Sequence, residues 1–207
     1  MKIIAVAMQK GGVGKSMLSK SLSVEATRAG LNAMLIDMDA QQSSSQWADR
    51  RESQLPLVRF STEIELPKIL GQAKAAGCDL VIIDTPPARS TETPAAVEAC
   101  DLVIVPCSPD IEAYEQLPRT VRLARTTGKP AVAVLTLAQP NSRSEPEIAR
   151  QVFETVNISM APTVIHRFKA HKDASREGLS VAENEPDSKA AAQIRDLWKW
   201  ISAQLQL

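Results

Sequence analysis

The sequence predicts an α/β protein with a doubly wound, mostly parallel twisted sheet and helices on both faces. Short apolar runs alternate with longer helical patterns, and strands separated by helices pair in parallel through right-handed crossovers. Hydrophobic residues make up 44% of the chain but aromatic residues only 3%. The core must therefore be built from aliphatic side chains, which is typical of parallel strands buried under helices.

The N-terminal quarter contains two strand–helix units. Apolar residues 2–8 predict the first strand, and a helical pattern over residues 15–29 ends at Gly30. The second strand covers residues 32–36, and a short helix follows over residues 43–52 after a loop. The first helix thus begins in a glycine-rich turn that follows an apolar strand directly.

The most strand-like segment is residues 79–84, a continuous apolar run that ends in a carboxylate and is followed by two prolines. We expect it at the centre of the sheet. A strand over residues 57–60 and a helix over residues 63–76, with Pro67 near its start, precede it. The same unit then repeats through helices at residues 91–99, 111–127 and 145–156 and strands at residues 102–105 and 131–135.

The C-terminal segment is predicted to contain a strand near residues 163–165, a polar segment over residues 166–178 and a final helix over residues 188–205. No low-complexity tract or linker divides the chain, and its length suits one compact core. We therefore expect a single domain over residues 1–207.

Charge and cysteine content exclude several classes of protein. The 24 Lys and Arg balance the 24 Asp and Glu, so the surface as a whole does not attract polyanions, and any contact with nucleic acid must be a local patch. The cysteines Cys78, Cys100 and Cys107 lack CxxC spacing, which predicts reduced, buried thiols. No apolar stretch approaches the ~18 residues of a membrane-spanning helix. We expect a soluble, cytoplasmic protein.

A glycine-rich loop joins the first strand to the first helix. Its glycines let backbone amides approach phosphate oxygens, and the following helix adds its positive N-terminal end. The Lys15 ammonium can reach the β- and γ-phosphates, and the Ser16 hydroxyl can ligate Mg²⁺. The pattern predicts Mg-ATP binding by Lys10, Gly11, Gly12, Val13, Gly14, Lys15, Ser16 and Met17.

The loop has the pattern KGGxGK[ST] rather than GxxxxGK[ST], because Gln9 stands where the first glycine is usual. It resembles the ParA/MinD family of deviant-Walker P-loop ATPases, and specifically the small ParA type (ParF-like) without an N-terminal DNA-binding domain, along nearly the whole chain. The resemblance implies that Lys10 reaches the partner's phosphates in a nucleotide-sandwich dimer and that Lys10, Lys15 and Asp39 are catalytic. Met17 departs from the usual Thr.

Carboxylates follow the second strand and the most apolar strand. Asp37 and Asp39 alternate on an extended segment and can face one magnesium-containing pocket, although capping the next helix or facing solvent is the alternative. Asp84 ends a buried run, in the arrangement of a carboxylate aimed at metal-bound water. We expect Ser16, Asp37 and Asp84 at the metal. By resemblance, Asp39 positions the attacking water, Asp37 supports the metal shell and residues 85–89 form a switch.

Base identity and the DNA contact are predicted less directly. Strand 131–135 is not followed by NKxD, the usual guanine signature, so adenine is favoured. Between Arg119 and Arg176, Lys and Arg exceed Asp and Glu by six, which indicates a segregated basic patch that includes the arginines of helix 111–127. By resemblance the C-terminal half contacts DNA without sequence preference, through Arg167, Lys169, Lys172 and Arg176. His166 and His171 lack ligand spacing and are interpreted as surface or packing residues.

The resemblance implies an ATPase with weak intrinsic activity. ATP drives homodimerisation and non-specific DNA binding, a ParB-like or other adaptor stimulates hydrolysis, and the ATP state is nucleoid-associated. Two alternatives remain. A MinD-like membrane positioner would need the apolar side of the last helix, which is better suited to packing on the sheet. A reductase-like ATPase would share an iron–sulfur cluster through Cys100 and Cys107. The cargo stays open.

Overall fold

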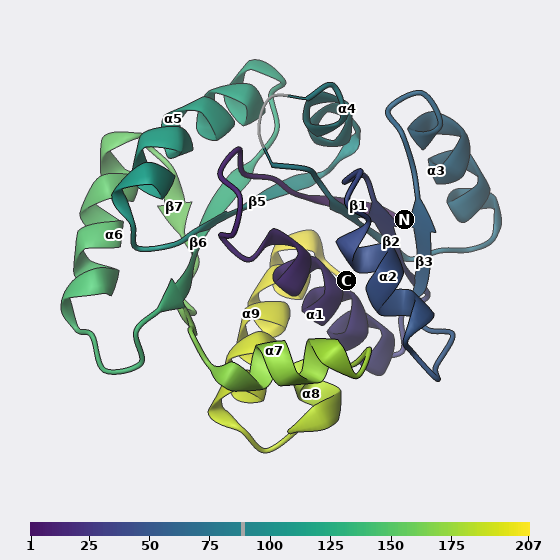
Figure 1. Cartoon of the computed structure of the whole chain (residues 1–207). Coiled ribbons are helices and arrows are strands. Elements are labelled where there is room, and N and C mark those ends of the chain that lie inside the picture. The colour runs from purple at the N-terminus through teal and green to yellow at the C-terminus, as the bar shows by residue number, and fades with distance from the viewer. Residues whose placement is uncertain (88–89) are drawn as a thin grey trace.

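A computed structural model describes residues 1–87 and 90–207 and shows helices on both faces of a central sheet (Figure 1). The strands are β1 (Lys2–Val6), β2 (Ala33–Asp37), β3 (Leu57–Phe60), β4 (Leu80–Asp84), β5 (Leu102–Cys107), β6 (Ala131–Ala138), β7 (Ser159–Met160) and β8 (Ile165–His166). In the described residues they form one eight-stranded sheet in the order β3-β2-β4-β1-β5-β6-β7, and β8 pairs with β6. These pairs are parallel, which confirms the predicted fold class.

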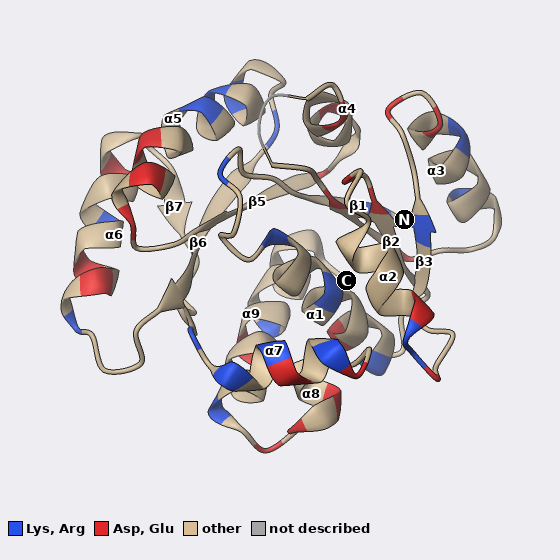
Figure 2. Cartoon of the chain, viewed as in Figure 1, with Lys and Arg blue, Asp and Glu red and all other residues tan. Residues whose placement is uncertain are grey.

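The helices cover the sheet as two groups. In chain order they are α1 (Lys15–Arg28), α2 (Ser43–Asp49), α3 (Leu66–Ala75), α4 (Glu92–Ala99), α5 (Ile111–Thr126), α6 (Ser144–Thr155), α7 (Lys169–Arg176), α8 (Val181–Asn184) and α9 (Lys189–Leu205). Side chains of α1, α2, α8 and α9 form one core with one face of the sheet, and α3 to α6 form the other. Alternation along β1 explains the division, because Ile4 faces the first core and Ala5 the second. Charged residues lie mostly on the helices and loops (Figure 2).

The carboxyl ends of the central strands are aligned. Asp84 at the end of β4 is paired in register with Val6 of β1 and with Asp37 of β2. The loop between β1 and α1 leaves the sheet at the same edge. The strand register therefore places the glycine-rich loop and two predicted carboxylates next to each other, as is typical of ligand sites in open α/β sheets.

The structure differs from the prediction in the segment after β6. Residues 166–178, interpreted as a polar segment, contain α7. The strand predicted near residues 163–165 corresponds to the short β8, and a second short strand, β7, precedes it. The segment is easily interpreted as polar, because α7 is strongly hydrophilic overall and its inner side is made of small residues such as Ala174, which is fully buried. A helix with so few large apolar residues is stabilised mainly by its neighbours.

The last helix packs on the sheet. Its apolar residues Ile194, Leu197, Trp198, Ile201 and Leu205 are buried in the core that α9 shares with α1, as predicted. The membrane alternative required this side of the helix to be available. Among the described helices, none combines the length and apolar character that crossing a bilayer would require.

Candidate nucleotide site

The loop between β1 and α1 has the backbone conformation that its glycines predict. Gly12 and Gly14 have φ angles of 78° and 90°, in the left-handed region where a side chain would be strained. Gly14 is also the residue before α1, and as a glycine it has no side chain to cap this end of the helix. The first N–H groups of α1 are therefore left to interact with an anion in the loop.

Lys15 lies inside this loop rather than in solvent. It is only 6% exposed, and its Nζ donates a hydrogen bond to the Lys10 carbonyl oxygen at 3.1 Å. Burial lowers the pKa of its ammonium group, and the negative charges of Asp84 and Asp39 act in the opposite direction. The positive charge is thus held at the place where phosphate oxygens would pass, while the side chain of Lys10 is half-buried.

Asp37 is engaged by the start of α2. It is fully buried, and its Oδ2 accepts hydrogen bonds from the backbone N–H groups of Ser44 and Ser45 at 3.0 and 2.8 Å and from the Ser45 hydroxyl at 3.0 Å. Its Oδ1 accepts from the Asp39 N–H at 3.1 Å. Asp37 therefore caps α2 in this structure, which is the alternative interpretation of the sequence, and its place at the metal stays a prediction.

Only one of the two carboxylate oxygens of Asp84 is hydrogen-bonded in the described part of the chain. Its Oδ2 accepts from the Ser44 hydroxyl at 2.7 Å, whereas its Oδ1 is buried without a partner in the described part of the chain. Burial raises the pKa of Asp84 to about 6, against the effect of the Ser44 hydrogen bond. A buried oxygen that lacks a donor fits a cation or its bound water next to Ser16. The predicted metal role of Asp84 is therefore compatible with the geometry.

The predicted loop lines a cavity of about 480 Å³. It lies at the carboxyl edge of the sheet, beside the start of the first helix. Asp39 lines it, but Asp37 and Asp84 lie deeper. The lining residues are Gly11, Gly12, Gly14, Lys15, Ser16, Met17, Asp39, Gln41, Ser43 and Pro87. Pro87 belongs to the predicted switch over 85–89, of which residues 88 and 89 lie outside the described residues.

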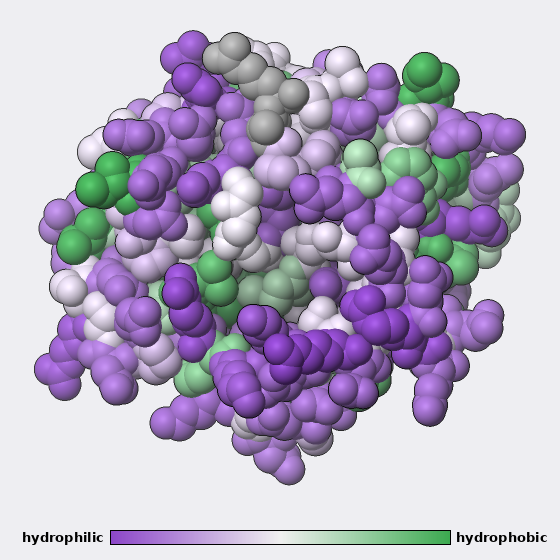
Figure 3. All heavy atoms as spheres, viewed as in Figure 1, coloured by the Kyte–Doolittle hydropathy of each residue, from purple (hydrophilic) through white to green (hydrophobic). Residues whose placement is uncertain are grey.

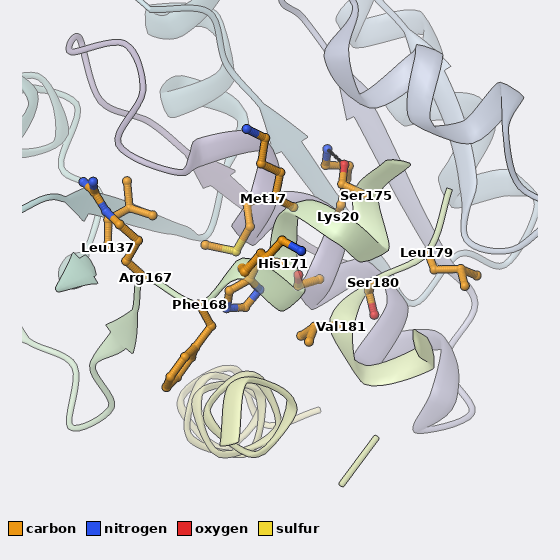
Figure 4. Close-up of a pocket in the computed structure, with 13 residues that line it drawn as sticks. Met17, Lys20, Leu137, Arg167, Phe168, His171, Ser175, Leu179, Ser180 and Val181 are labelled. Carbon is orange, nitrogen blue, oxygen red and sulfur yellow. Dashed lines mark hydrogen bonds between the residues drawn. The ribbon is translucent and has the colours of Figure 1, made fainter. Parts of the chain in front are cut away.

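A second, mostly apolar cavity of about 560 Å³ adjoins the first, because Met17 lines both. It lies between α1 and α7, and the space-filling view shows apolar atoms in a hollow above the hydrophilic surface of α7 (Figure 3). Leu137 and Arg167 line one end of this cavity, and His171 lies in its middle (Figure 4). No sequence motif indicates this cavity. The one available signal is position, because Arg167 and Phe168 directly follow the end of β8.

His171 has no hydrogen-bond partner in the described structure. Both ring nitrogens are buried, and burial lowers the pKa of the imidazole to about 4. It is therefore neutral at pH 7. Interpreting His171 as a packing residue explains why the side chain is buried. It does not explain why both ring nitrogens lack a hydrogen-bond partner in the described structure, beside a cavity large enough for a planar polar group.

Most of the predicted DNA-contact residues do not lie on a surface separate from the apolar cavity. Arg167, Lys169 and Lys172 also line the apolar cavity, whereas Arg176 lies at the far end of α7. Lys169 and Arg176 are exposed, and both contact Asp173, at 3.2 and 3.4 Å. These contacts are weak at such exposure, so α7 keeps its positive face (Figure 2).

The basic patch predicted from residues 119–176 is divided by the fold. Arg119, Arg122 and Arg125 lie on α5, which covers the opposite face of the sheet from the α1 and α9 core beside α7 (Figures 1 and 2). The Arg125 Nη2 donates to the Val156 carbonyl oxygen at 3.0 Å and thus joins α5 to the end of α6. The prediction of one continuous patch is wrong, because sequence proximity does not determine which face a helix covers.

Two of the three cysteines are buried as predicted. Cys100 and Cys107 are 1% and 0% exposed, and burial raises the pKa of their thiols to about 11 and about 12. Cys78 is half-buried, and the three thiols are free. A cluster shared between subunits requires thiols at the surface, so the iron–sulfur alternative is contradicted by these positions.

Comparison with known proteins agrees with this geometry. The family model described as the CobQ/CobB/MinD/ParA nucleotide binding domain matches residues 4–186. The chain is 33% identical to the maintenance of carboxysome distribution protein A of Gloeobacter kilaueensis over 186 residues, covering 88% of this chain and 84% of the relative. It is 25% identical to the sporulation initiation inhibitor protein Soj of Bacillus subtilis over 250 residues, covering 98% of both.

Solved structures share the fold at low identity. The septum site-determining protein MinD of Pyrococcus horikoshii, complexed with Mg-ADP, aligns with a TM-score of 0.81 at 18% identity, covering 99% of this chain and 97% of that one. The ATP complex of a Cyanothece McdA variant aligns with a TM-score of 0.76 at 17% identity, covering 100% of this chain and 97% of that one.

Proposed function

Because the chain belongs to the CobQ/CobB/MinD/ParA nucleotide-binding family, we propose that it is a ParA-type Mg-ATPase whose ATP-bound dimer binds DNA without sequence preference and so positions a cargo. The observation that carries the proposal is the glycine loop at the carboxyl edge of the sheet, with the buried Lys15 ammonium inside it and the unpartnered Asp84 oxygen beneath it, among the described residues. Neighbours solved as ATP or Mg-ADP complexes support the same ligand.

The triphosphate is held by the loop. Backbone N–H groups from Gly11 to Ser16 and the N-terminal end of α1 face its oxygens, and Lys15 exchanges its hydrogen bond with the Lys10 carbonyl for a phosphate oxygen. The side chain of Lys10 serves the nucleotide of the partner subunit, as the family resemblance implies. Two ammonium groups for each triphosphate offset charge that one cannot cancel alone.

Mg²⁺ neutralises charge on the β- and γ-phosphates when bound. Ser16 and Asp84 would hold it, with Asp84 acting through its free oxygen. Asp37 supports this arrangement indirectly, because it caps α2, and Ser44 of α2 donates to Asp84. Among the described residues no three acidic, histidine or cysteine side chains form a metal cluster, so phosphates and water would supply most ligands. Asp39, which lines the loop cavity, orients the attacking water.

The adenosine occupies the apolar cavity that Met17 shares with the loop. A cavity of about 560 Å³ is within the usual range for small-molecule sites. Leu137 and Met17 offer apolar contact to the base, and the neutral His171 offers one donor and one acceptor. Adenosine carries both hydrogen-bond donors and acceptors, so it can pair with both ring nitrogens of His171. This pairing explains why the two nitrogens are buried without a protein partner among the described residues.

The cargo is bound through DNA and an adaptor. The exposed cations of α7 neutralise backbone phosphates, and a ParB-like or other adaptor stimulates the slow hydrolysis and releases the dimer. The relatives named for carboxysome distribution and chromosome partitioning indicate which classes of cargo the same ATPase serves elsewhere. Burial of the apolar side of α9 supports this interpretation over a MinD-like membrane attachment.

The proposal is tested by DNA binding in three nucleotide states. Fluorescence anisotropy of a labelled random-sequence duplex is measured with Mg-ATP, Mg-ADP and no nucleotide, for the wild type, Lys15→Ala and Lys74→Ala. Lys74 is an exposed lysine of α3 and serves as the control. We expect binding with Mg-ATP alone, lost in Lys15→Ala and kept in Lys74→Ala. Equal binding in the three states, or Lys15→Ala binding like the wild type, contradicts the proposal.

A further inference from the structure

The last turn of α2 meets α7 at a basic hollow that the sequence does not indicate. A depression of about 410 Å³ is lined by Arg50, Lys172, Ser175 and Arg176. Arg50 directly follows α2, more than 100 positions before the other three, and its Nη2 donates to the Ser175 carbonyl oxygen at 3.1 Å. Three cations and one hydroxyl from two separate elements thus surround the same space.

The groups around the hollow are arranged for an anion. No carboxylate is among its described lining residues, and Asp173, which contacts Arg176 at 3.4 Å, also serves Lys169. The Ser175 hydroxyl oxygen accepts a hydrogen bond from Lys20 Nζ at 3.2 Å, so its own proton is free to be donated. The planar guanidinium of Arg50 matches the geometry of a phosphate group.

We propose that Arg50, Lys172, Arg176 and the Ser175 hydroxyl bind one backbone phosphate of DNA. The inference rests on the proposed function. It adds Arg50, which directly follows α2, to a DNA-contacting surface that the family resemblance assigns to Arg167, Lys169, Lys172 and Arg176. A phosphate diester presents two anionic oxygens, which suits a site with several donors and no carboxylate. The contact carries no base information, in agreement with binding that ignores sequence.

The helix α2 connects Arg50 to the nucleotide site. The first turn of α2 is tied to the buried carboxylates, because Ser45 donates to Asp37 and Ser44 to Asp84. The other end is tied to the segment after α7, because the Trp47 Nε1 donates to the Leu179 carbonyl oxygen at 3.1 Å. Seven residues of helix span about 10 Å, so α2 is a short rigid connection between the two sites.

The test compares Arg50→Ala with Arg50→Lys and with the control Lys74→Ala. DNA affinity of the full chain with Mg-ATP is measured by anisotropy at several salt concentrations, and melting temperatures show that each variant is folded. For Arg50→Ala we expect affinity at ~0.1 M salt to fall by roughly tenfold and the slope of log affinity against log salt to become shallower by about one for each bound protomer. Arg50→Lys keeps the wild-type slope with a smaller loss.

The outcomes separate the inference from the proposed function. If the wild type binds DNA and Arg50→Ala matches it in affinity and slope, the inference is overturned and the proposed function stands. A lower affinity with an unchanged slope also overturns it, because Arg50 would then act only by holding α7 in place. Absence of DNA binding by the wild type with Mg-ATP overturns both.

Discussion

At the scale of single residues, the site is defined by charges that the fold removes from water. Lys15 and Asp84 are buried close to each other, and burial lowers the pKa of the lysine and raises that of the carboxyl group. Both shifts arise chiefly because burial disfavours the charged form of each group. A triphosphate beside the ammonium and a cation beside the carboxylate would each favour the charged form, so ligand binding and ionisation of these groups are coupled.

His171 makes stability depend on pH. Its pKa of about 4 in the folded protein lies below the usual 6.5, so the unfolded chain binds the proton first as the pH falls. Stability is therefore lost between pH 6.5 and about 4, by roughly 3 kcal/mol at most. The other charged groups that line the same cavity are Lys20, Arg167, Lys169 and Lys172.

The measurement is urea unfolding of the wild type and His171→Gln at pH 7.5 and 4.5. Other groups titrate equally in both proteins, so the difference between them isolates the imidazole. We expect His171→Gln to gain stability relative to the wild type as the pH is lowered. A difference that does not change with pH would show that His171 takes up its proton in the folded state as easily as in the unfolded chain.

At the scale of elements, the contact between α2 and the α7–α8 turn is unusually close. Arg51, whose side chain is 2% exposed, pairs with Glu183 at 2.7 Å and donates to the Gly178 carbonyl oxygen at 2.7 Å. Gly178 has a φ of 69°, and a Cβ on it would lie 2.7 Å from the Arg50 carbonyl carbon. A glycine is therefore required both by conformation and by the approach of another backbone.

Gly178→Ala tests this contact when it is compared with the same substitution at a glycine of similar conformation. Gly128 has a similar φ of 67°, but no described atom outside its chain neighbours lies within 4 Å of the position that a Cβ would take there. We expect Gly128→Ala to cost about 1 kcal/mol from the backbone conformation alone. Gly178→Ala should cost roughly 1–3 kcal/mol more, because α2 must move away. Chemical denaturation of both variants measures the difference, and equal losses would mean that the two elements separate without cost.

At the scale of the whole molecule, the sheet places its two cores on opposite faces and its polar groups at the carboxyl edge. The central strands β1 and β4 are buried, so the loops that follow them are held on a rigid support. Lys10 belongs to the loop after β1, in which Gly11 and Gly12 are exposed. An exposed loop that carries a second cation beside the nucleotide suits a dimer in which the nucleotide lies between two copies.

Lys10→Ala separates nucleotide binding from dimerisation. Light scattering after size-exclusion chromatography should show that the mass of the wild type and of Lys74→Ala doubles in Mg-ATP. We expect Lys10→Ala to stay monomeric, while calorimetry shows ATP affinity within about tenfold of the wild type, because the Lys15 contact within the monomer is kept. Dimerisation of Lys10→Ala with wild-type affinity would remove Lys10 from the proposed interface.

A feature can be predicted from the sequence when it depends on residues that are close in the chain, and not when it depends on distant ones. Strand 79–84 and the helix that begins at Lys15 are predictable because a buried strand and a glycine loop are local patterns. The helix α7 is not, because its buried side is made of small residues such as Ala174 in a segment that is strongly hydrophilic overall. Strand alternation places Asp37 and Asp39 together, but the α2 amides engage Asp37, which no spacing rule indicates.

The sequence by itself determined the fold class, the nucleotide loop and the lysine and serine at its end, because these depend on residues that are neighbours in the chain. Only the tertiary structure decided that Arg50 joins α7, that His171 lies unpaired among the described residues beside Met17, and that the α5 arginines cover another face. Contacts such as that of Arg50 join residues more than 100 positions apart, and their energies depend on shape and burial, which leave no periodic trace in the sequence.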